Sequence, residues 1–216
     1  MAELLVELYS EEIPAGLQES SVKTFEVMLL RHFDEVGLIY KTSEVFWGPM
    51  RLTICIDGLA LKSTDININK RGPRVDANEI AINGFAKGLG IHIKDLSKIE
   101  TDKGEFYFYK KPEKKIRTID LLKENVPKIL DKISWKKSMK WGDFDLNWAR
   151  PLKSILAIFD NQTLEFNYYH LKSCNSTYLD KEFEEKKKIF KNFKSYKNYF
   201  KKSGIIIDQN LRKQFI

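Results

Sequence analysis

A short stretch of basic and aromatic residues has the composition of a nucleic-acid contact. Residues 135–141 read WKKSMKW, so three lysines lie between two tryptophans. Lysine neutralises backbone phosphate, and an aromatic ring stacks on an unpaired base. We therefore predict RNA contacts at Lys136, Lys137, Lys140 and Trp141. A structural interpretation has equal standing, in which Trp141 and Met139 fill the core while the lysines face solvent.

A second pair of basic residues lies next to a loop signal. Arg71 and Arg74 flank the Gly72-Pro73 pair, which is typical of a turn and presents neighbouring side chains outward. Both arginines are predicted phosphate contacts. Ordinary exposed placement, without a ligand, is the alternative interpretation.

Catalytic chemistry has less support in the residues. Glu11 and Glu12 are adjacent acids, but neighbours on an extended chain point to opposite sides. We expect them instead to accept backbone N–H bonds where the following helix begins. The glycines of residues 84–90 fit neither common nucleotide-binding loop pattern, and glycine after a helix explains them better. We predict no catalytic residue.

Metal binding and disulfide formation are not indicated either. The three histidines lack the close Cys, His or acidic partners that a zinc site needs; they are His32, His92 and His170. Cys55 and Cys174 lie far apart, which implies no disulfide framework. The start of the chain carries acid where a signal peptide needs base, and no apolar run is long enough to span a bilayer. The prediction is a cytoplasmic protein without a membrane partner.

Hydrophobic periodicity predicts the elements that must position these residues. Strands are expected at residues 3–9, 51–57, 65–69, 105–111, 154–159 and 163–171, and helices at residues 18–36, 78–87 and 119–133. Residues 51–57 alternate in a way that predicts one buried face. In the second helix Ile80, Phe85 and Leu89 are expected to point inward, and Asp160-Asn161 is expected to form a hairpin turn.

These elements predict an α+β fold with a mixed, largely antiparallel sheet packed by helices. After Ser173 the composition shifts to Lys, Glu, Asn and Phe, which is typical of an exposed helix. We therefore divide the chain into an N-terminal α+β domain, residues 1–175, and a basic, mostly helical extension, residues 176–216.

Charge is unevenly distributed along the 216 residues, whose net charge is +7. Residues 1–40 hold eight acidic residues against two basic ones, whereas residues 103–140 hold twelve basic against five acidic. Residues 181–202 hold nine lysines against three glutamates. Such segregation favours a polyanionic partner, because phosphates respond to local potential. Solvated lysines on helix faces are the alternative.

Four collinear blocks resemble the beta subunit of the bacterial, heterotetrameric glycyl-tRNA synthetase. They are residues 3–15 (ELLVELYSEEIPA), residues 49–52 (PMRL), residues 70–73 (KRGP) with 84–86 (GFA), and residues 137–142 (KSMKWG) with 150–152 (RPL). Some positions depart from the family pattern: Met50 stands where the family has a first of two arginines, and residues 178–182 replace a downstream motif.

The resemblance implies a role in an α2β2 ligase that joins glycine to its tRNA at the expense of ATP. On this resemblance, the alpha subunit holds the adenylate-forming site and uses ATP and Mg, and this chain needs no cofactor. The partners implied are glycine-specific tRNA and the ligase alpha subunit. The fold implied is similar to the B3/B4 module of the phenylalanine enzyme's beta subunit, and the basic extension would lead into further C-terminal domains.

Two other functions remain open from the sequence. The similar B3/B4 module edits misacylated tRNA, so an editing-type hydrolase is one alternative. A purely structural interaction module is the other, with the acidic front region, including Glu19, Glu26 and Glu35, as its interface.

Overall fold

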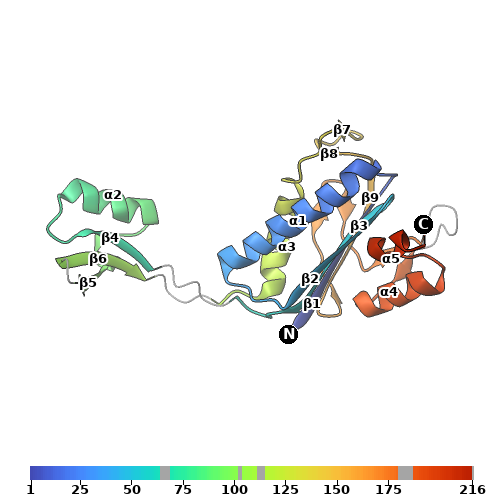
Figure 1. Cartoon of the computed structure of the whole chain (residues 1–216). Helices are drawn as coiled ribbons and strands as arrows, with labels where there is room; N and C mark the ends of the chain where they lie inside the picture. Colours follow the sequence, from blue (N-terminus) through green and yellow to red (C-terminus); the bar gives the residue numbers. More distant parts are fainter. Residues whose placement is uncertain (64–68, 102–103, 111–114, 180–186, 216) are drawn as a thin grey trace. The chain divides into compact units, whose positions relative to one another are not determined.

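The chain folds into two compact units. The structure, a computed structural model, describes residues 1–63, 69–101, 104–110, 115–179 and 187–215 (Figure 1). The first unit comprises Met1–Thr64 and Ile116–Ile216, and the second unit comprises Asp65–Lys115. The units therefore divide at positions other than the predicted boundary after residue 175. That the last residues lead into further domains stays a prediction.

The first unit contains most of the secondary structure. Its strands are β1 (Ala2–Ser10), β2 (Thr42–Gly48), β3 (Arg51–Leu59), β7 (Met139–Lys140), β8 (Asn147–Trp148), β9 (Leu152–Phe159), β10 (Gln162–Thr163), β11 (Asn167–Tyr168), β12 (Leu171–Lys172), β13 (Ser176–Thr177) and β14 (Lys188–Ile189). Its helices are α1 (Ala15–Val36), α3 (Thr118–Leu130), α4 (Phe193–Lys202) and α5 (Gln209–Lys213).

A five-stranded antiparallel sheet forms the centre of the first unit, in the order β10-β9-β1-β3-β2. The helices α1 and α3 cover one face, and α4 and α5 lie on the other (Figure 1). In the described residues every ladder is antiparallel, and one isolated parallel bridge joins Leu156 to Cys174. The α+β class and the largely antiparallel sheet are confirmed.

The helix α1 follows the predicted apolar stripe. Val22, Phe25, Leu29 and Phe33 recur at spacings of three and four residues, and all four are buried against the sheet. The helix ends at Gly37, whose φ of 66° lies in the left-handed region that glycine adopts without steric cost. The predicted C-cap is confirmed.

The central strands are buried on both faces, contrary to the prediction for residues 51–57. Leu52, Ile54 and Ile56 belong to the core beneath α1 and α3, as expected. Thr53 and Cys55, on the opposite face, are also buried. The cause is α4, which packs there and which the sequence predicted to be exposed.

The helix α4 forms the centre of a second core. Tyr196 and Phe200 have no exposed surface, and Phe193 is also buried. The helix begins at a capping box formed by Asn192 and Ser195. The lysine-rich composition concealed this aromatic stripe, because one helix face can be apolar while the others carry charge.

The hairpin turn at Asp160 and Asn161 is confirmed. Both residues have positive φ, 51° and 61°, as a two-residue turn between β9 and β10 requires. The second strand is shorter than predicted and ends at Thr163. The chain then forms a separate small hairpin from β11 and β12.

The second unit is a three-stranded antiparallel sheet with one α-helix against it. Its elements are β4 (Asn69–Arg74), α2 (Glu79–Leu89), the 3-10 helix η1 (Ile93–Asp95), β5 (Ser97–Thr101) and β6 (Gly104–Lys110), with strand order β4-β6-β5. The prediction for α2 was wrong at Ile80, which is 82% exposed; Ile82 and Ala86 are buried instead. The predicted strand at residues 65–69 falls mostly outside the described residues.

No helix in the described ranges is long and apolar enough to cross a membrane.

Candidate nucleic-acid interface

The predicted basic stretch, residues 135–141, leads into a small hairpin in the first unit. Met139–Lys140 pairs with Asn147–Trp148, so β7 and β8 hold residues 141–146 as the loop between them. Trp135 and Trp148 are buried, and their rings lie 4.8 Å apart in a tilted arrangement. These two tryptophans anchor the hairpin to the core.

Trp141 has a structural role in this hairpin. Its indole Nε1 donates a hydrogen bond of 2.9 Å to the backbone oxygen of Trp148, and its ring packs half-buried against the core. Met139, by contrast, is 58% exposed. The structural interpretation therefore describes Trp141 and fails for Met139.

The three lysines differ in their surroundings. Lys136 and Lys137 are exposed, and within the described part of the chain neither has an ion-pair partner. Lys140 forms an exposed ion pair of 2.6 Å with Asp145, and the hydrogen bond and charge of that carboxylate raise the pKa of Lys140. Lys136 and Lys137 therefore present the larger unneutralised charge.

The structure adds aromatic residues that the sequence did not single out. Phe144, in the loop of the hairpin, is 42% exposed and stacks on His170 at 4.7 Å between ring centroids. Tyr169 is 44% exposed and has a φ of 51°, which is uncommon for a residue other than glycine. Tyr169 and His170 form the turn between β11 and β12. No local pattern in the sequence indicated that this turn would reach Phe144.

Arg71 and Arg74 belong to the second unit, so the six predicted contacts are divided between two units. The guanidinium of Arg71 lies 4.0 Å from the ring centroid of Phe106, and Arg71 is exposed. Arg74 forms an exposed ion pair of 3.1 Å with Asp76. Arg71 is therefore the less neutralised of the two cations.

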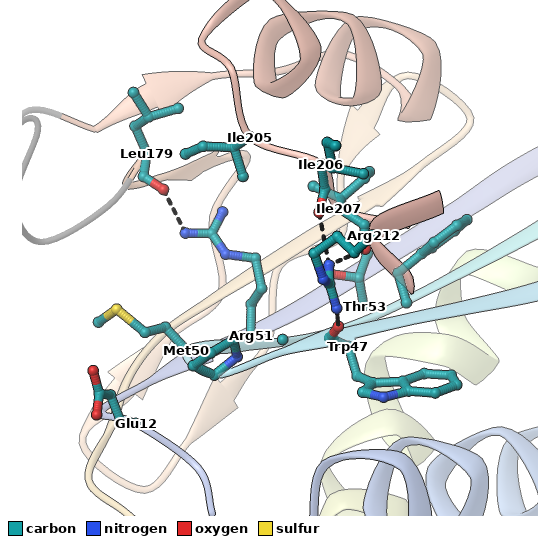
Figure 2. Close-up of a pocket in the computed structure, with 13 residues that line it drawn as sticks. Glu12, Trp47, Met50, Arg51, Thr53, Leu179, Ile205, Ile206, Ile207 and Arg212 are labelled. Carbon is teal, nitrogen blue, oxygen red and sulfur yellow. Dashed lines mark hydrogen bonds between the residues drawn. The ribbon is translucent and has the colours of Figure 1, made fainter. Parts of the chain in front are cut away.

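A pocket of about 330 Å³ opens on the α4 side of the first unit (Figure 2). Arg51 donates to the backbone oxygen of Leu179 at 2.6 Å. Arg212 donates to the oxygens of Ile206 at 2.7 Å and Ile207 at 3.0 Å, and to that of Trp47. Both guanidinium groups thus form hydrogen bonds between chain segments that are far apart in sequence and meet at the pocket.

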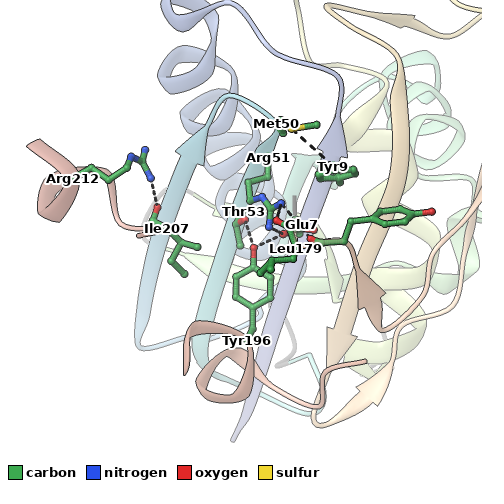
Figure 3. Close-up of polar contacts among 10 residues, drawn as sticks. Glu7, Tyr9, Met50, Arg51, Thr53, Leu179, Tyr196, Ile207 and Arg212 are labelled. Carbon is green, nitrogen blue, oxygen red and sulfur yellow. Dashed lines mark hydrogen bonds and ion pairs between the residues drawn. The ribbon is translucent and has the colours of Figure 1, made fainter. Parts of the chain in front are cut away.

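Arg51 and Thr53, which line the pocket, also belong to a buried polar network (Figure 3). Glu7 is fully buried in β1, and its carboxylate lies 3.5 Å from Arg51 Nη1 and accepts a hydrogen bond from the Tyr196 hydroxyl. Thr53 Oγ1 lies 3.3 Å from the same hydroxyl. Burial, together with the Glu7 charge, raises the pKa of Tyr196 far above its ordinary value, so the phenol stays protonated.

Arg51, the cation of this network, is kept charged by Glu7 and Tyr196. Burial by itself would lower the pKa of Arg51, but the Glu7 carboxylate and Tyr196 outweigh burial and raise it. A buried charge is tolerated when it is paired in this way. The network therefore connects β1, β3 and α4, and its components have structural partners.

The adjacent acids Glu11 and Glu12 lie in different surroundings. Glu11 forms an ion pair of 2.5 Å with Lys153, whereas Glu12 lines the pocket. The helix α1 begins after Pro14, whose side chain makes no cap hydrogen bond, and the expectation that these carboxylates accept N–H bonds there stays a prediction. Within the described ranges no group of three or more His, Cys, Asp or Glu could hold a metal ion.

Comparison with known proteins gives a consistent result. A family model described as glycyl-tRNA synthetase beta subunit matches residues 4–216. A glycine–tRNA ligase beta subunit from Rickettsia canadensis (strain McKiel) is 35% identical over 217 residues, 100% of this chain and 32% of the relative. Those from Rickettsia bellii (strain OSU 85-389) and Rickettsia prowazekii (strain Madrid E) are each 33% identical over 216 residues, again over 100% of this chain.

These matches first define a class, the subunits of aminoacyl-tRNA synthetases. Within that class the chain belongs to the glycyl-tRNA synthetase beta subunit family. The resemblance seen in the four sequence blocks is confirmed. The chain spans about a third of the length of the curated relatives it matches.

Proposed function

We propose that this domain contacts glycine-specific tRNA through the β7–β8 hairpin, as part of a cytoplasmic α2β2 glycine–tRNA ligase. One observation carries the proposal: Lys136 and Lys137 are exposed, and in the described structure neither has an ion-pair partner. The loop of the hairpin also presents the exposed ring of Phe144. Cations without a carboxylate partner are free to replace the counterions of phosphate. Exposed rings supply surfaces on which unpaired bases stack.

Bond formation is proposed to occur on the alpha subunit, with ATP and Mg bound there. In this chain Glu7, the one acid of the described network, is buried and forms an ion pair with Arg51, and family membership supports an accessory role. The chain then contributes tRNA contact and a surface for subunit assembly. The similarity of its fold to the B3/B4 module stays a prediction.

A salt titration tests the tRNA contact. The variant Lys136→Gln/Lys137→Gln/Lys140→Gln should bind glycine tRNA more weakly than the parent chain. The plot of log K against log salt concentration has a slope to which each phosphate contact contributes about 0.9. We therefore expect the magnitude of the slope to fall by about 2 to 3 in this variant. The matched control replaces three exposed lysines elsewhere with glutamine, at Lys123, Lys128 and Lys132.

The control variant removes the same charge and should keep the slope close to that of the parent. Equal loss in the two variants would show that binding depends on net charge alone, and the proposal for the hairpin would be wrong. An unchanged slope in the hairpin variant would exclude contact through these lysines.

The pocket favours a second candidate, hydrolysis of misacylated tRNA. It could hold a small group, and Glu12 is the carboxylate among its lining residues. If this candidate is correct, the chain releases amino acid from misacylated glycine tRNA, and Glu12→Gln abolishes the release. Absence of turnover in the parent chain, with tRNA bound, would exclude it.

A further inference from the structure

The sheet of the second unit places two tyrosines of its central strand on one face. Tyr107 and Tyr109 lie two residues apart in β6, and successive side chains of a strand alternate between faces. Phe106 and Phe108 therefore belong to the opposite face. Both tyrosines are half-buried, so part of each side chain stays accessible.

Each tyrosine has a lysine as its cross-strand partner. Tyr107 pairs with Lys98 of β5, and Tyr109 pairs with Lys70 of β4. Residues directly opposite in an antiparallel pair lie on the same face, with Cβ atoms about 5 Å apart. Both lysines are exposed. The result is a diagonal of Lys70, Tyr109, Tyr107 and Lys98 across the three strands, called here the tyrosine face.

The opposite face carries Phe106, which is buried. Ile82 and Ala86 of α2 are also buried, and α2 contacts β4. Arg71 covers the Phe106 ring from its edge of the sheet. None of the four residues of the tyrosine face is buried.

We propose that the tyrosine face is a binding platform for single-stranded RNA. Residues two apart on a strand are about 6.8 Å apart, which is enough for each ring to stack on a separate base. The lysines on either side stand where the backbone phosphates would pass. Double-stranded RNA keeps its bases stacked internally, so the platform favours unpaired nucleotides.

Two carboxylates set one end of the platform. Glu100 and Glu105 are directly opposite each other and, by the same alternation, lie on the tyrosine face beyond Tyr107. Both are exposed. Like charges in this position repel phosphate, so the RNA backbone runs from Tyr107 toward Tyr109 and Lys70 and ends before the glutamates.

This inference rests on the proposed RNA-binding function for its partner class, but it uses different residues. The experiment measures binding of the full 216-residue chain to a single-stranded RNA oligonucleotide, to a duplex of the same sequence and to glycine tRNA. The variant Tyr107→Leu/Tyr109→Leu removes the rings and keeps apolar side chains. The matched control, Tyr107→Phe/Tyr109→Phe, keeps the rings.

We expect the leucine variant to bind the single strand at least about 10-fold more weakly, and the phenylalanine variant to stay within about 2-fold of the parent. The variant Lys70→Gln/Lys98→Gln should lower the salt slope by about 1.4, since each contact to a single strand accounts for about 0.7. Photo-crosslinking of the parent chain should label the tryptic peptide of residues 104–110.

Unchanged binding in the leucine variant, or equal affinity for the duplex and the single strand, would overturn the platform. If the leucine variant does not fold, the lysine variant and the crosslinked peptide decide. The hairpin variant at Lys136, Lys137 and Lys140 is measured in parallel. If only the hairpin variant loses binding, RNA contact through the hairpin is supported and the platform is overturned. If only the tyrosine-face variants lose binding, the platform is supported and contact through the hairpin is overturned.

Discussion

Glu7 shows how a single residue can depend on a distant part of the chain. Its carboxylate is fully buried and accepts a hydrogen bond from Tyr196, which is 189 residues away in sequence. The strand β1 was predictable from its composition, but the burial of Glu7 was not, because nothing local shows that α4 covers that face. Long-range packing decides whether a charge on a strand faces solvent or needs a partner.

Replacing Glu7 tests the role of this network in stability. The variant Glu7→Gln keeps the side-chain shape but leaves the buried Arg51 without its counter-charge. We expect the free energy of unfolding to fall by about 3 kcal/mol, because breaking a buried pair leaves an uncompensated charge. Urea unfolding measures the change, provided that both proteins show the same dependence of unfolding free energy on urea concentration. The exposed pair of Glu124 and Lys128 provides the control, since Glu124→Gln should change stability little.

Glu3 gives a pH-dependent prediction. Burial raises the pKa of its carboxyl, despite the hydrogen bond of 2.6 Å that it accepts from the Phe193 N–H. Because the folded-state pKa lies above the unfolded value, the folded protein binds this proton more tightly. The group therefore contributes stability below the unfolded pKa, and that contribution is lost as the pH rises through the folded pKa.

The variant Glu3→Gln keeps the hydrogen-bond acceptor and removes the titration. Relative to the parent chain, it should gain stability as the pH rises from about 4 to about 7. Thermal unfolding of both proteins across this range measures the difference. A difference that stays constant, or that changes in the opposite direction, would contradict the raised pKa.

At the scale of elements, hydrophobic periodicity predicted the positions of the longer helices and strands, but not which elements pack against them. The helix α1 and its glycine cap followed from a regular apolar stripe. The strands β2 and β5 were not predicted, because exposed residues interrupt the first and fill most of the second. The buried aromatic face of α4 was missed because lysines dominate its composition. Which strands lie at the edge of a sheet, and which helices cover its faces, depends on tertiary contacts between residues far apart in sequence.

Two glycines of the second unit should respond in opposite ways to the same substitution. An added Cβ at Gly72 in β4 would stand 2.5 Å from the ring of Phe85, whereas a Cβ at Gly84 in α2 would meet nothing within 4 Å. Gly84→Ala should stabilise this unit by about 0.5–1 kcal/mol, since alanine favours the helix. Gly72→Ala should destabilise it, because Phe85 must move.

Hydrogen exchange of the α2 amides measures both effects. Protection should increase in the Gly84 variant and decrease in the Gly72 variant, while the amides of β1 in the first unit stay unchanged. Equal effects in the two variants would show that Phe85 does not pack closely on β4.

At the scale of the whole molecule, the charge segregation seen in the sequence has a structural counterpart. Two of the four acids of α1 are paired on the helix itself, Glu19 with Lys23 and Glu35 with Arg31. Glu26 accepts a hydrogen bond from Ser43 of β2. Lys136 and Lys137 have no such match in the described structure. Composition predicted where the basic residues lie, but only the fold shows which of them are neutralised.

The most direct test of tRNA contact is hydrogen exchange of the chain with and without glycine tRNA. If the β7–β8 hairpin binds the tRNA, the amides of residues 136–148 should exchange more slowly in the complex, and high salt should abolish the protection. The amides on the exposed face of α1 should not change. Binding of tRNA without protection of the hairpin, or with protection confined to α1, would contradict the account.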